Sequence, residues 1–368
     1  MKKLNMNYKK LLPACAFVFA GFMLQAQEYS DNIKLSKSFK VNTSSTVEVY
    51  NKYGKLHIVT WEHDSVKFDV HALIQSSTET KVRKLRDNIS FDFTGTEYYI
   101  TAKSVFSNKY SGFFKDLADF AEGLITSDNK VEIDYKIYIP EYVNLKLNNK
   151  FGDIYIENII GDINITLSNG ALKANNFEGN SIIKLTMGDA DIKMVKNGKI
   201  YTNYSELNID ECDQINIDSK LSKINIDVAK IIKVSSKKDK IYINSMDQIY
   251  GESYFTDIWV YDLANKMSYK ANYGNINLES IKKGFSFIDI TTEYTDINMF
   301  FEEESVFDVD IVDKGSFLQY PINKANVKRE SIDNDEERFN TFGVIGTGTS
   351  ESKLKIEATK GNIHIYYK

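Results

Sequence analysis

Short strands with alternating polar and apolar positions recur at a fixed distance through the middle of the chain. Each copy begins with a small or turn-forming residue, followed by a polar, an apolar, a variable and a second apolar residue. There are nine copies: Gly152–Ile156, Gly170–Ala174, Gly188–Ile192, Ser205–Ile209, Ser222–Ile226, Asp239–Ile243, Thr256–Val260, Gly274–Leu278 and Thr295–Met299. Successive copies start 18, 18, 17, 17, 17, 17, 18 and 21 residues apart. Such a period indicates a repeat architecture.

A second short strand lies between many of the copies. These strands are Ile163–Leu167, Ile215–Ile217, Phe285–Ile290 and Val306–Ile311. A strand pair this short cannot bury its apolar side alone, whereas stacked units form a continuous core. We therefore predict an all-β fold, a parallel β-solenoid with rungs of 17–18 residues. Nine rungs at a strand spacing of about 4.8 Å would extend roughly 43 Å.

The residue before each copy is usually aromatic or apolar, which predicts a ladder of stacked side chains. Its members are Tyr53, Phe151, Met187, Tyr204, Leu221, Phe255, Tyr273 and Tyr294. The glycines that begin several copies are expected to take positive φ at a corner, because glycine reaches that region without steric cost.

The N-terminal part of the mature chain, residues 27–148, is predicted to be an elaborated β region. Asn51–Ile58 within it is already one copy of the repeat. Two helices are predicted there. The first covers Ser76–Ile89 and has a capping box from Ser76 to Glu79, and the second covers Phe113–Ile125.

The rest of the mature chain divides into three segments. The repeat solenoid is predicted over residues 149–323 and a charged loop over residues 324–342. Residues 343–368 are predicted to supply strands that complete the solenoid, with a last copy of the repeat at Gly361.

Residues 1–26 are typical of a signal peptide. Four lysines precede the apolar run Leu11–Leu24, and Leu24–Ala26 offers a cleavage site, so the mature chain is expected to start near Gln27. The apolar run is too short to be a stable membrane span. Cys15 resembles a lipidation site, but most of the apolar core follows it, which argues against lipidation.

The composition is that of a folded, acidic protein. The chain has 46 Lys and Arg against 51 Asp and Glu, a net charge of −5, and loss of the four signal-peptide lysines leaves 42 against 51, or −9. Such a surface repels phosphate backbones, which argues against nucleic acid as a partner. Cys212 is the one cysteine left, so no intramolecular disulfide is expected. It is either buried or, if Ile209–Ile215 is a turn, exposed.

The central residue of each repeat strand is expected to face solvent, because both of its neighbours are apolar. Along the stack this position holds Tyr155, Lys173, Asp191, Asn208, Asn225, Tyr242, Trp259, Asn277 and Asn298. Tyr242 and Trp259, with Asn on either side, suit stacking on a sugar or an extended peptide. The alternative is a solvated face stabilised by contacts between rungs. The candidate binding residues are therefore Tyr155, Asn225, Tyr242, Trp259 and Asn277.

No group of residues indicates catalysis, a metal or a cofactor. His57, His63 and His71 are near one another in sequence, but nothing makes them converge as metal ligands must. Four acids share one repeat position, which predicts a structural role at turns instead of calcium binding or glycosidase chemistry. They are Asp153, Asp189, Asp257 and Asp296.

Three parts of the sequence resemble a known family. Gly54–Phe68, the repeated Gly-(Asp/Asn)-Ile units, and Gly343–Gly348 followed by Thr359–Ile365 are similar to an uncharacterised family of exported β-strand-repeat proteins labelled putative adhesins. The resemblance covers most of the mature chain and implies a β-solenoid of Gram-negative envelopes without established enzymatic activity. Phe106–Asp128 and Lys324–Arg338 depart from the pattern and are candidates for the site of specificity.

The expected function is that of a non-enzymatic, adhesin-like β-solenoid of the envelope or cell surface. It would bind a glycan or a protein through an exposed sheet face. The alternatives are a solenoid enzyme acting on polysaccharide and a periplasmic accessory protein in envelope-stress signalling. The mature chain is expected to lack a transmembrane segment and to reside in the periplasm, at the outer-membrane surface or outside the cell.

Overall fold

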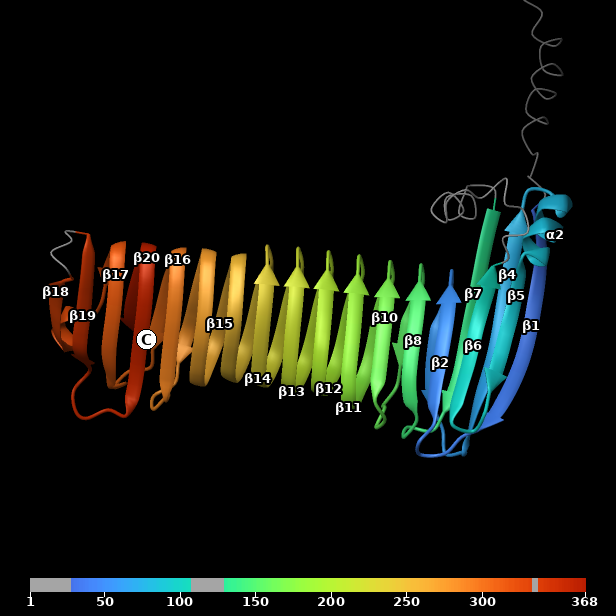
Figure 1. Cartoon of the computed structure of the whole chain (residues 1–368), viewed down its shortest axis with the longest axis horizontal. Coiled ribbons are helices and arrows are strands. Elements are labelled where there is room, and N and C mark those ends of the chain that lie inside the picture. Colours follow the sequence, from blue (N-terminus) through green and yellow to red (C-terminus); the bar gives the residue numbers. More distant parts are fainter. Residues whose placement is uncertain (1–27, 107–128, 333–336) are drawn as a thin grey trace, which may run out of the picture. The chain divides into compact units, whose positions relative to one another are not determined.

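The computed structural model describes residues 28–106, 129–332 and 337–368, and it is almost entirely β-structure (Figure 1). Strands account for 77% of these residues and helices for 4%. The strands form one long, mostly parallel sheet, so the predicted all-β class is confirmed. The second predicted helix, over Phe113–Ile125, falls outside the described residues.

The strands follow one another along the chain with few interruptions. The first ten are β1 (Tyr29–Lys40), β2 (Thr46–Lys52), β3 (Leu56–Thr60), β4 (Ser65–Ser76), β5 (Ile89–Gly95), β6 (Tyr99–Phe106), β7 (Asn129–Ile139), β8 (Asn144–Lys150), β9 (Ile154–Ile156) and β10 (Ile163–Ser168). The next ten are β11 (Ala171–Thr186), β12 (Asp189–Asn203), β13 (Glu206–Lys220), β14 (Lys223–Lys237), β15 (Lys240–Ile281), β16 (Phe287–Phe301), β17 (Phe307–Gln319), β18 (Ala325–Ser331), β19 (Arg338–Ile345) and β20 (Ser352–Tyr367). A short 3₁₀ helix, η2, covers Ile322–Lys324.

The chain divides into two compact units. The larger contains Lys34–His71, Phe91–Val105 and Ile133–Lys368, and it holds all of the repeats. The described part of the smaller unit comprises residues 28–33, 72–90, 106 and 129–132. No helix in the described parts of the chain is long and apolar enough to cross a membrane.

The smaller unit holds α2 (Glu79–Asp87), which corresponds to the first predicted helix. Its N-cap is Thr78, whose hydroxyl accepts a hydrogen bond from the Lys81 N–H at 3.3 Å. The capping box predicted from Ser76 was wrong, because Ser76 is the last residue of β4 and its hydroxyl donates to Asn129 Oδ1 at 2.6 Å.

The repeats of the larger unit form a stack of parallel rungs, where a rung is one copy of the repeat with the strand segment that follows it. Asp189 in β12 pairs with Glu206 in β13, and Glu206 pairs with Lys223 in β14, both at an offset of 17 residues. Gly274 in β15 pairs with Thr295 in β16, at an offset of 21 residues. These offsets equal the repeat distances, so the predicted parallel, in-register stacking is confirmed.

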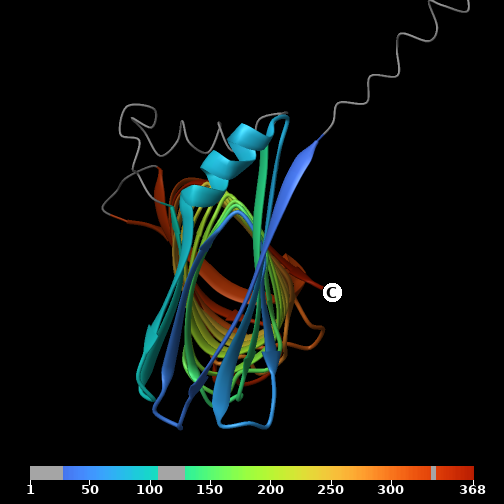
Figure 2. The same ribbon diagram turned by 90° about the vertical axis from the view of Figure 1, so that its right-hand side faces the viewer.

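Each rung buries its apolar residues in a shared interior. This interior lies between two layers of strand, which Figure 2 shows from the end of the stack. In β14 the inward residues Ile224, Ile226, Ile232 and Val234 are at most 2% exposed. Full burial of one such side chain stabilises the fold by about 1.5–3 kcal/mol. Neighbouring rungs therefore stabilise one another through a continuous core.

Rungs that are neighbours in the stack are not always neighbours in sequence. β3 pairs with β9, which places Leu56 beside Ile154 and confirms Asn51–Ile58 as a copy of the repeat. β20 lies between β16 and β17 and is parallel to both, so the last copy, at Gly361, is inside the stack.

The predicted charged loop over residues 324–342 was wrong, because much of this segment forms the antiparallel strands β18 and β19. Arg329 in β18 donates to both carboxylate oxygens of the buried Asp313, at 2.8 and 3.0 Å. Charged residues suit β18 because it lies at the edge of the sheet, where charge opposes pairing with other chains.

Each copy of the repeat is preceded by a residue in the left-handed region of backbone conformation. The φ angle is +57° at Phe151, +52° at Tyr204 and +59° at Tyr273. The backbone N–H of such a corner residue donates to the rung after it, as from Tyr204 to the Lys220 carbonyl at 3.0 Å. The prediction that the glycines take positive φ was wrong for most copies, although Gly361 has a φ of +99°.

Glycine follows the corner in several rungs because successive rungs approach closely there. A Cβ atom on Gly152 would lie 2.0 Å from the carbonyl oxygen of Gly54, and one on Gly170 would lie 2.2 Å from that of Gly152. Where the chain has a polar residue instead, its side chain is buried and bonds to the neighbouring rung. Asp239 Oδ1, for example, accepts from the Ser222 N–H at 2.6 Å.

Cys212 is 1% exposed inside the core, so the alternative of an exposed thiol was wrong. The expected turn over Ile209–Ile215 is part of β13, where Cys212 pairs with Val195 of β12 and Ala229 of β14. Burial, with a smaller contribution from Asp213, raises the pKa of the Cys212 thiol to about 12.

Replacing Gly170 by alanine is expected to destabilise the protein by about 1–3 kcal/mol. The new methyl group would overlap the carbonyl oxygen of Gly152, which can move only if the backbone of its rung shifts. Gly198→Ala is the matched control, since the nearest atom to its Cβ would be a Val195 methyl group at 3.0 Å, and the nearest backbone atom would be 3.5 Å away. Denaturant unfolding of both variants measures the difference. Equal stability losses would contradict the role assigned to the close approach.

The Cys212 thiol is expected to resist thiol-specific reagents in the native protein at pH 8. Because its pKa is raised to about 12, almost none of it is the reactive thiolate at that pH, and the core excludes the reagent. The labelling rate in increasing denaturant, followed by mass spectrometry, checks this. Rapid labelling without denaturant would show that the thiol is accessible.

Candidate functional site

The candidate binding residues predicted from the sequence all lie on one outer face of the larger unit, in a single row. We call this the central row. From β3 to β20 in stack order it contains His57, Tyr155, Lys173, Asp191, Asn208, Asn225, Tyr242, Trp259, Asn277, Asn298 and His364. The residues on either side of each member point inward and are buried, as Ile241 and Ile243 are around Tyr242. The row therefore faces solvent.

Amide side chains in the central row bond from rung to rung. Asn208 Nδ2 donates to Asp191 Oδ1 at 2.8 Å, and Asn225 Nδ2 donates to Asn208 Oδ1 at 2.6 Å. Asn298 Nδ2 likewise donates to Asn277 Oδ1 at 2.9 Å. These bonds fix the side chains in one orientation. They are contacts between rungs of the kind expected if the row is a solvated, stabilising face.

Tyr242 and Trp259 form a parallel stack on adjacent rungs. Their ring centroids are 4.7 Å apart and their planes differ by 9°. Since this separation is close to the strand spacing of about 4.8 Å, the ring faces lie against each other along the stack and the ring edges point to solvent. Both side chains are half-buried. A ligand would meet edges and polar atoms, not an open ring face.

Tyr155 lies in a different part of the central row from the other candidates. It is five rungs from Tyr242, or roughly 24 Å at the usual strand spacing. Asn225, Tyr242, Trp259 and Asn277 occupy four successive rungs. The structure therefore brings four of the five predicted residues together and leaves Tyr155 outside that group.

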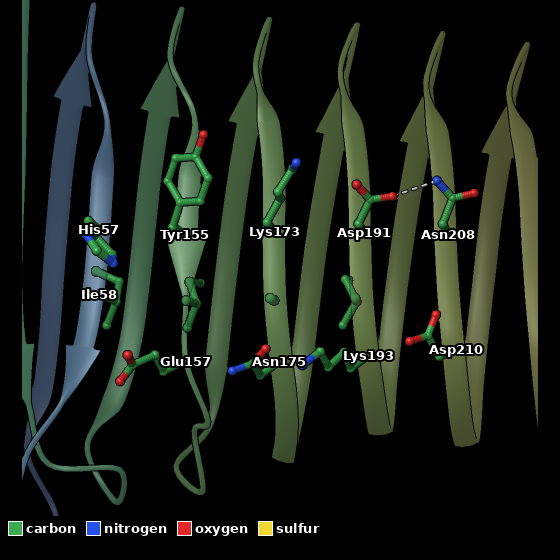
Figure 3. A pocket seen from close by; sticks show the side chains of 13 residues that line it. His57, Ile58, Tyr155, Glu157, Lys173, Asn175, Asp191, Lys193, Asn208 and Asp210 are labelled. Carbon is green, nitrogen blue, oxygen red and sulfur yellow. Dashed lines mark hydrogen bonds between the residues drawn. The ribbon is translucent and has the colours of Figure 1, made fainter.

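Tyr155 instead lines a shallow hollow of about 430 Å³ on the same face (Figure 3). The side chains of His57, Lys173 and Asp191 also line it, and a parallel row contributes Glu157, Asn175, Lys193 and Asp210. The Tyr155 hydroxyl donates to Asp153 Oδ2 at 3.1 Å, and this bond raises the pKa of the tyrosine. The hollow mixes both signs of charge and lacks an enclosed, desolvated centre.

Three of the four acids that share one repeat position act as hydrogen-bond acceptors between rungs. Asp153 Oδ1 accepts from the Ala171 N–H at 3.0 Å, and Asp296 Oδ1 accepts from the Asn362 N–H at 2.7 Å. Asp257 Oδ1 accepts from Asn275 Nδ2 at 2.7 Å. Their shared position matches the structural role that the sequence predicts.

The histidines do not assemble with other ligands. His63 packs edge-on against Trp61, with ring centroids 4.9 Å apart, and His364 Nδ1 lies 2.9 Å from Asn298 Oδ1. His57 meets Tyr155 edge-on, with ring centroids 6.1 Å apart. Within residues 28–106, 129–332 and 337–368, no group of three or more His, Cys, Asp or Glu side chains is placed to hold a metal ion.

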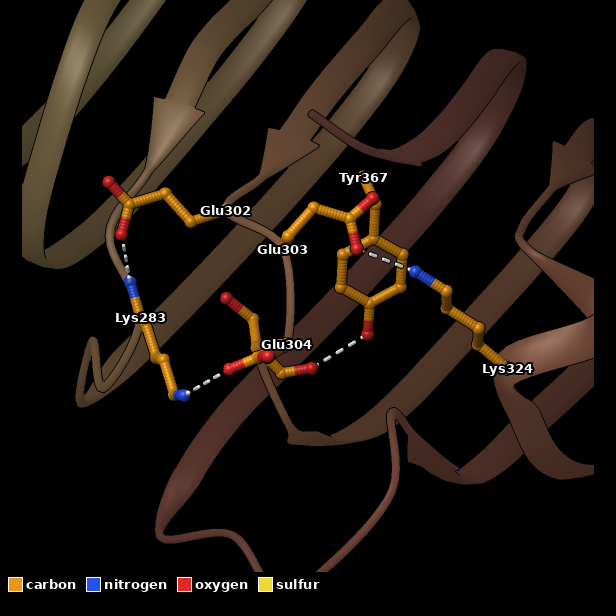
Figure 4. Close-up of polar contacts among 7 residues, drawn as sticks. Lys283, Glu302, Glu303, Glu304, Lys324 and Tyr367 are labelled. Carbon is orange, nitrogen blue, oxygen red and sulfur yellow. Dashed lines mark hydrogen bonds and ion pairs between the residues drawn. The ribbon is translucent and has the colours of Figure 1, made fainter.

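An acidic turn between β16 and β17 is matched by lysines (Figure 4). Lys283 Nζ donates to Glu304 at 3.2 Å, and Lys324 Nζ donates to Glu303 at 2.7 Å. Glu302 accepts from the Lys283 N–H at 2.9 Å, and this bond, with the Lys282 ammonium, lowers the pKa of Glu302. The turn is therefore charge-compensated and is a weak candidate for cation binding.

The corner residues that precede the copies of the repeat form a second surface, which the sequence analysis did not identify as a candidate site. The ladder of aromatic residues was predicted, but its left-handed backbone was not, and neither was the exposure of its members. Phe255 is 48% exposed, and it stacks on Tyr273 at 4.8 Å between ring centroids. The sequence does contain one indication of the left-handed backbone. Asn169, a residue type that tolerates positive φ, occupies the same position in another rung.

Comparison with known proteins gives structural neighbours only. No family model matches the sequence, and no curated protein matches it. Solved structures similar to the chain include three from bacteria. A "putative cell adhesion protein" from Clostridium sporogenes is 10% identical, with a TM-score of 0.19, and the match covers 92% of this chain and 100% of that one.

The other two are "putative adhesins" from Bacteroides fragilis and Parabacteroides merdae. They are 9% and 11% identical, with TM-scores of 0.27 and 0.24. The matches cover 90% and 73% of this chain, and 97% and 92% of those chains. The names agree with the family that the sequence resembles, but likenesses this low carry no argument about activity.

Proposed function

We propose that the chain is an exported, non-enzymatic β-solenoid of the cell envelope or cell surface, which binds a glycan or a protein through its central row. The solenoid assignment is supported by the parallel rungs at offsets of 17–21 residues around a shared interior. Repeat solenoids bind partners along extended surfaces, because each rung repeats the same side-chain positions. The binding face is the group Asn225, Tyr242, Trp259 and Asn277.

The Tyr242–Trp259 stack is the observation that carries this proposal. The described residues supply no hydrogen-bond partner for the Trp259 indole N–H or for the Tyr242 hydroxyl, so both can meet a ligand. The rings are held rigid by their stacking, and rigid aromatic groups with a polar tip are preferred in binding surfaces because they lose little entropy. The neighbouring amides add oriented polar groups.

Trp259→Ala is expected to weaken binding by about thirtyfold, which corresponds to the roughly 2 kcal/mol typical of an aromatic residue at the centre of an interface. Binding is measured on a glycan array and by capture of envelope proteins with the purified chain. Tyr201→Ala is the matched control, because Tyr201 is also aromatic and 40% exposed but lies on the other strand segment of its rung. Unchanged binding by Trp259→Ala would refute this site.

Export predicts a defined N-terminus. Protein recovered from the envelope fraction is expected to begin near Gln27, as read by N-terminal sequencing, because cleavage after Ala26 follows the signal-peptide pattern. Protease treatment of intact cells then separates a surface location from a periplasmic one. An uncleaved chain beginning at Met1 and found only in the cytoplasm would contradict the proposal.

A further inference from the structure

The corners of successive rungs form a continuous outer edge of the larger unit. We define the corner strip as the positive-φ residue that precedes each copy of the repeat, from Tyr53 to Lys360 in stack order, together with the residue before it. Eleven rungs contribute to it. The residues that flank the strip on its inner side, such as Ser205 and Ser219, are buried, and apart from the buried Tyr53 the strip projects outward.

The corner strip is basic on an acidic protein. Its lysines are Lys52, Lys150, Lys220, Lys237, Lys238 and Lys360, and its one acid is Glu293. The whole chain, by contrast, has a net charge of −5. Lys52 and Lys150 lie side by side on paired strands, and burial together with the Lys150 charge lowers the pKa of Lys52. The strip therefore attracts anions where the rest of the surface repels them.

The same strip exposes large apolar side chains. Met187 is 58% exposed, Tyr204 is 54%, Phe255 is 48% and Tyr294 is 42%. The rings of Phe255, Tyr273 and Tyr294 stack in series, with the second pair of ring centroids 5.1 Å apart and the planes differing by 2°. Contiguous exposed apolar side chains mark surfaces that are covered by a partner.

Lysines lie at both ends of the row of stacked rings in the strip. Lys238 precedes Phe255 in the stack and Lys360 follows Tyr294, where its ammonium lies 4.9 Å from the ring centroid and 3.1 Å from the hydroxyl. Lys237 lies 5.9 Å from the centroid of the Tyr254 ring. These lysine ammonium groups therefore lie close enough to the exposed rings to contact the same ligand.

We propose that the corner strip binds the surface of an anionic phospholipid bilayer. Tyrosine and phenylalanine on a projecting edge can enter the interfacial layer, while lysines beside them meet lipid phosphates. A projecting edge fits a plane, whereas a single polysaccharide chain is better held in a groove. This surface is separate from the central row, so its test does not depend on the proposed function.

Co-sedimentation of the full mature chain with lipid vesicles tests the proposal. Binding is expected to vesicles of phosphatidylcholine with phosphatidylglycerol and to fall strongly in phosphatidylcholine alone or at high salt. Lys220→Gln with Lys237→Gln and Lys238→Gln should weaken partitioning by about a hundredfold, since each lysine near an anionic surface contributes about 1 kcal/mol.

A second variant removes the rings without altering charge. Phe255→Asn with Tyr273→Asn and Tyr294→Asn keeps the corner backbone, because Asn169 already occupies this position with φ of +55°. Circular dichroism checks that the fold is intact. This variant is also expected to lose vesicle binding.

The matched control is Lys199→Gln with Lys233→Gln and Lys353→Gln, which removes three exposed lysines outside the strip. It should bind vesicles like the unaltered chain. An equal loss in this control, absence of vesicle binding by the unaltered chain, or retained vesicle binding by the strip variants would overturn the proposal. Binding of an acidic polysaccharide such as alginate, but not of vesicles, would overturn it in favour of a glycan.

Discussion

The close backbone contact at each corner is the constraint on which the rest of the larger unit depends. A residue in the left-handed region reverses the chain, and the residue after it lies so near the previous rung that a Cβ on Gly170 would be 2.2 Å from a carbonyl oxygen. Where side chains are present there, as in Ser222 and Asp239, they are buried and accept hydrogen bonds from backbone N–H groups of the previous rung. The corner thereby fixes where every strand begins.

Because every strand begins at the same place, equivalent residues of successive rungs lie in rows. One outer row carries the amide bonds and the Tyr242–Trp259 stack, and the projecting edge carries lysines and exposed rings. Each row is a one-dimensional surface whose chemistry can change along the stack without disturbing the core. A scaffold of this kind can carry two binding surfaces at once, since core and surface positions alternate along each strand.

Periodicity made much of the fold predictable. It correctly aligned Tyr242 with Trp259, because equivalent repeat positions must meet in a parallel stack. It could not reveal that β20 lies between β16 and β17, since a repeat specifies which residues align but not which copies are neighbours. Positive φ is expected of glycine because other residues rarely adopt it, yet Tyr273 has a φ of +59° and stacks its ring on Tyr294. The polar residues around Cys212 favour a turn as one of two alternatives, although the strand continues through them.

Distances between spin labels test the central claim, that the repeats are parallel rungs in register, most directly. With Cys212 replaced by serine, cysteines at Lys173 and at Asn225, Asn277 or Asn298 carry nitroxide labels in pairs along the central row. Pulsed electron paramagnetic resonance is expected to give separations that grow by about 4.8 Å for each rung between the labels. Separations that do not increase with the number of rungs would contradict the stacked arrangement and the surfaces built on it.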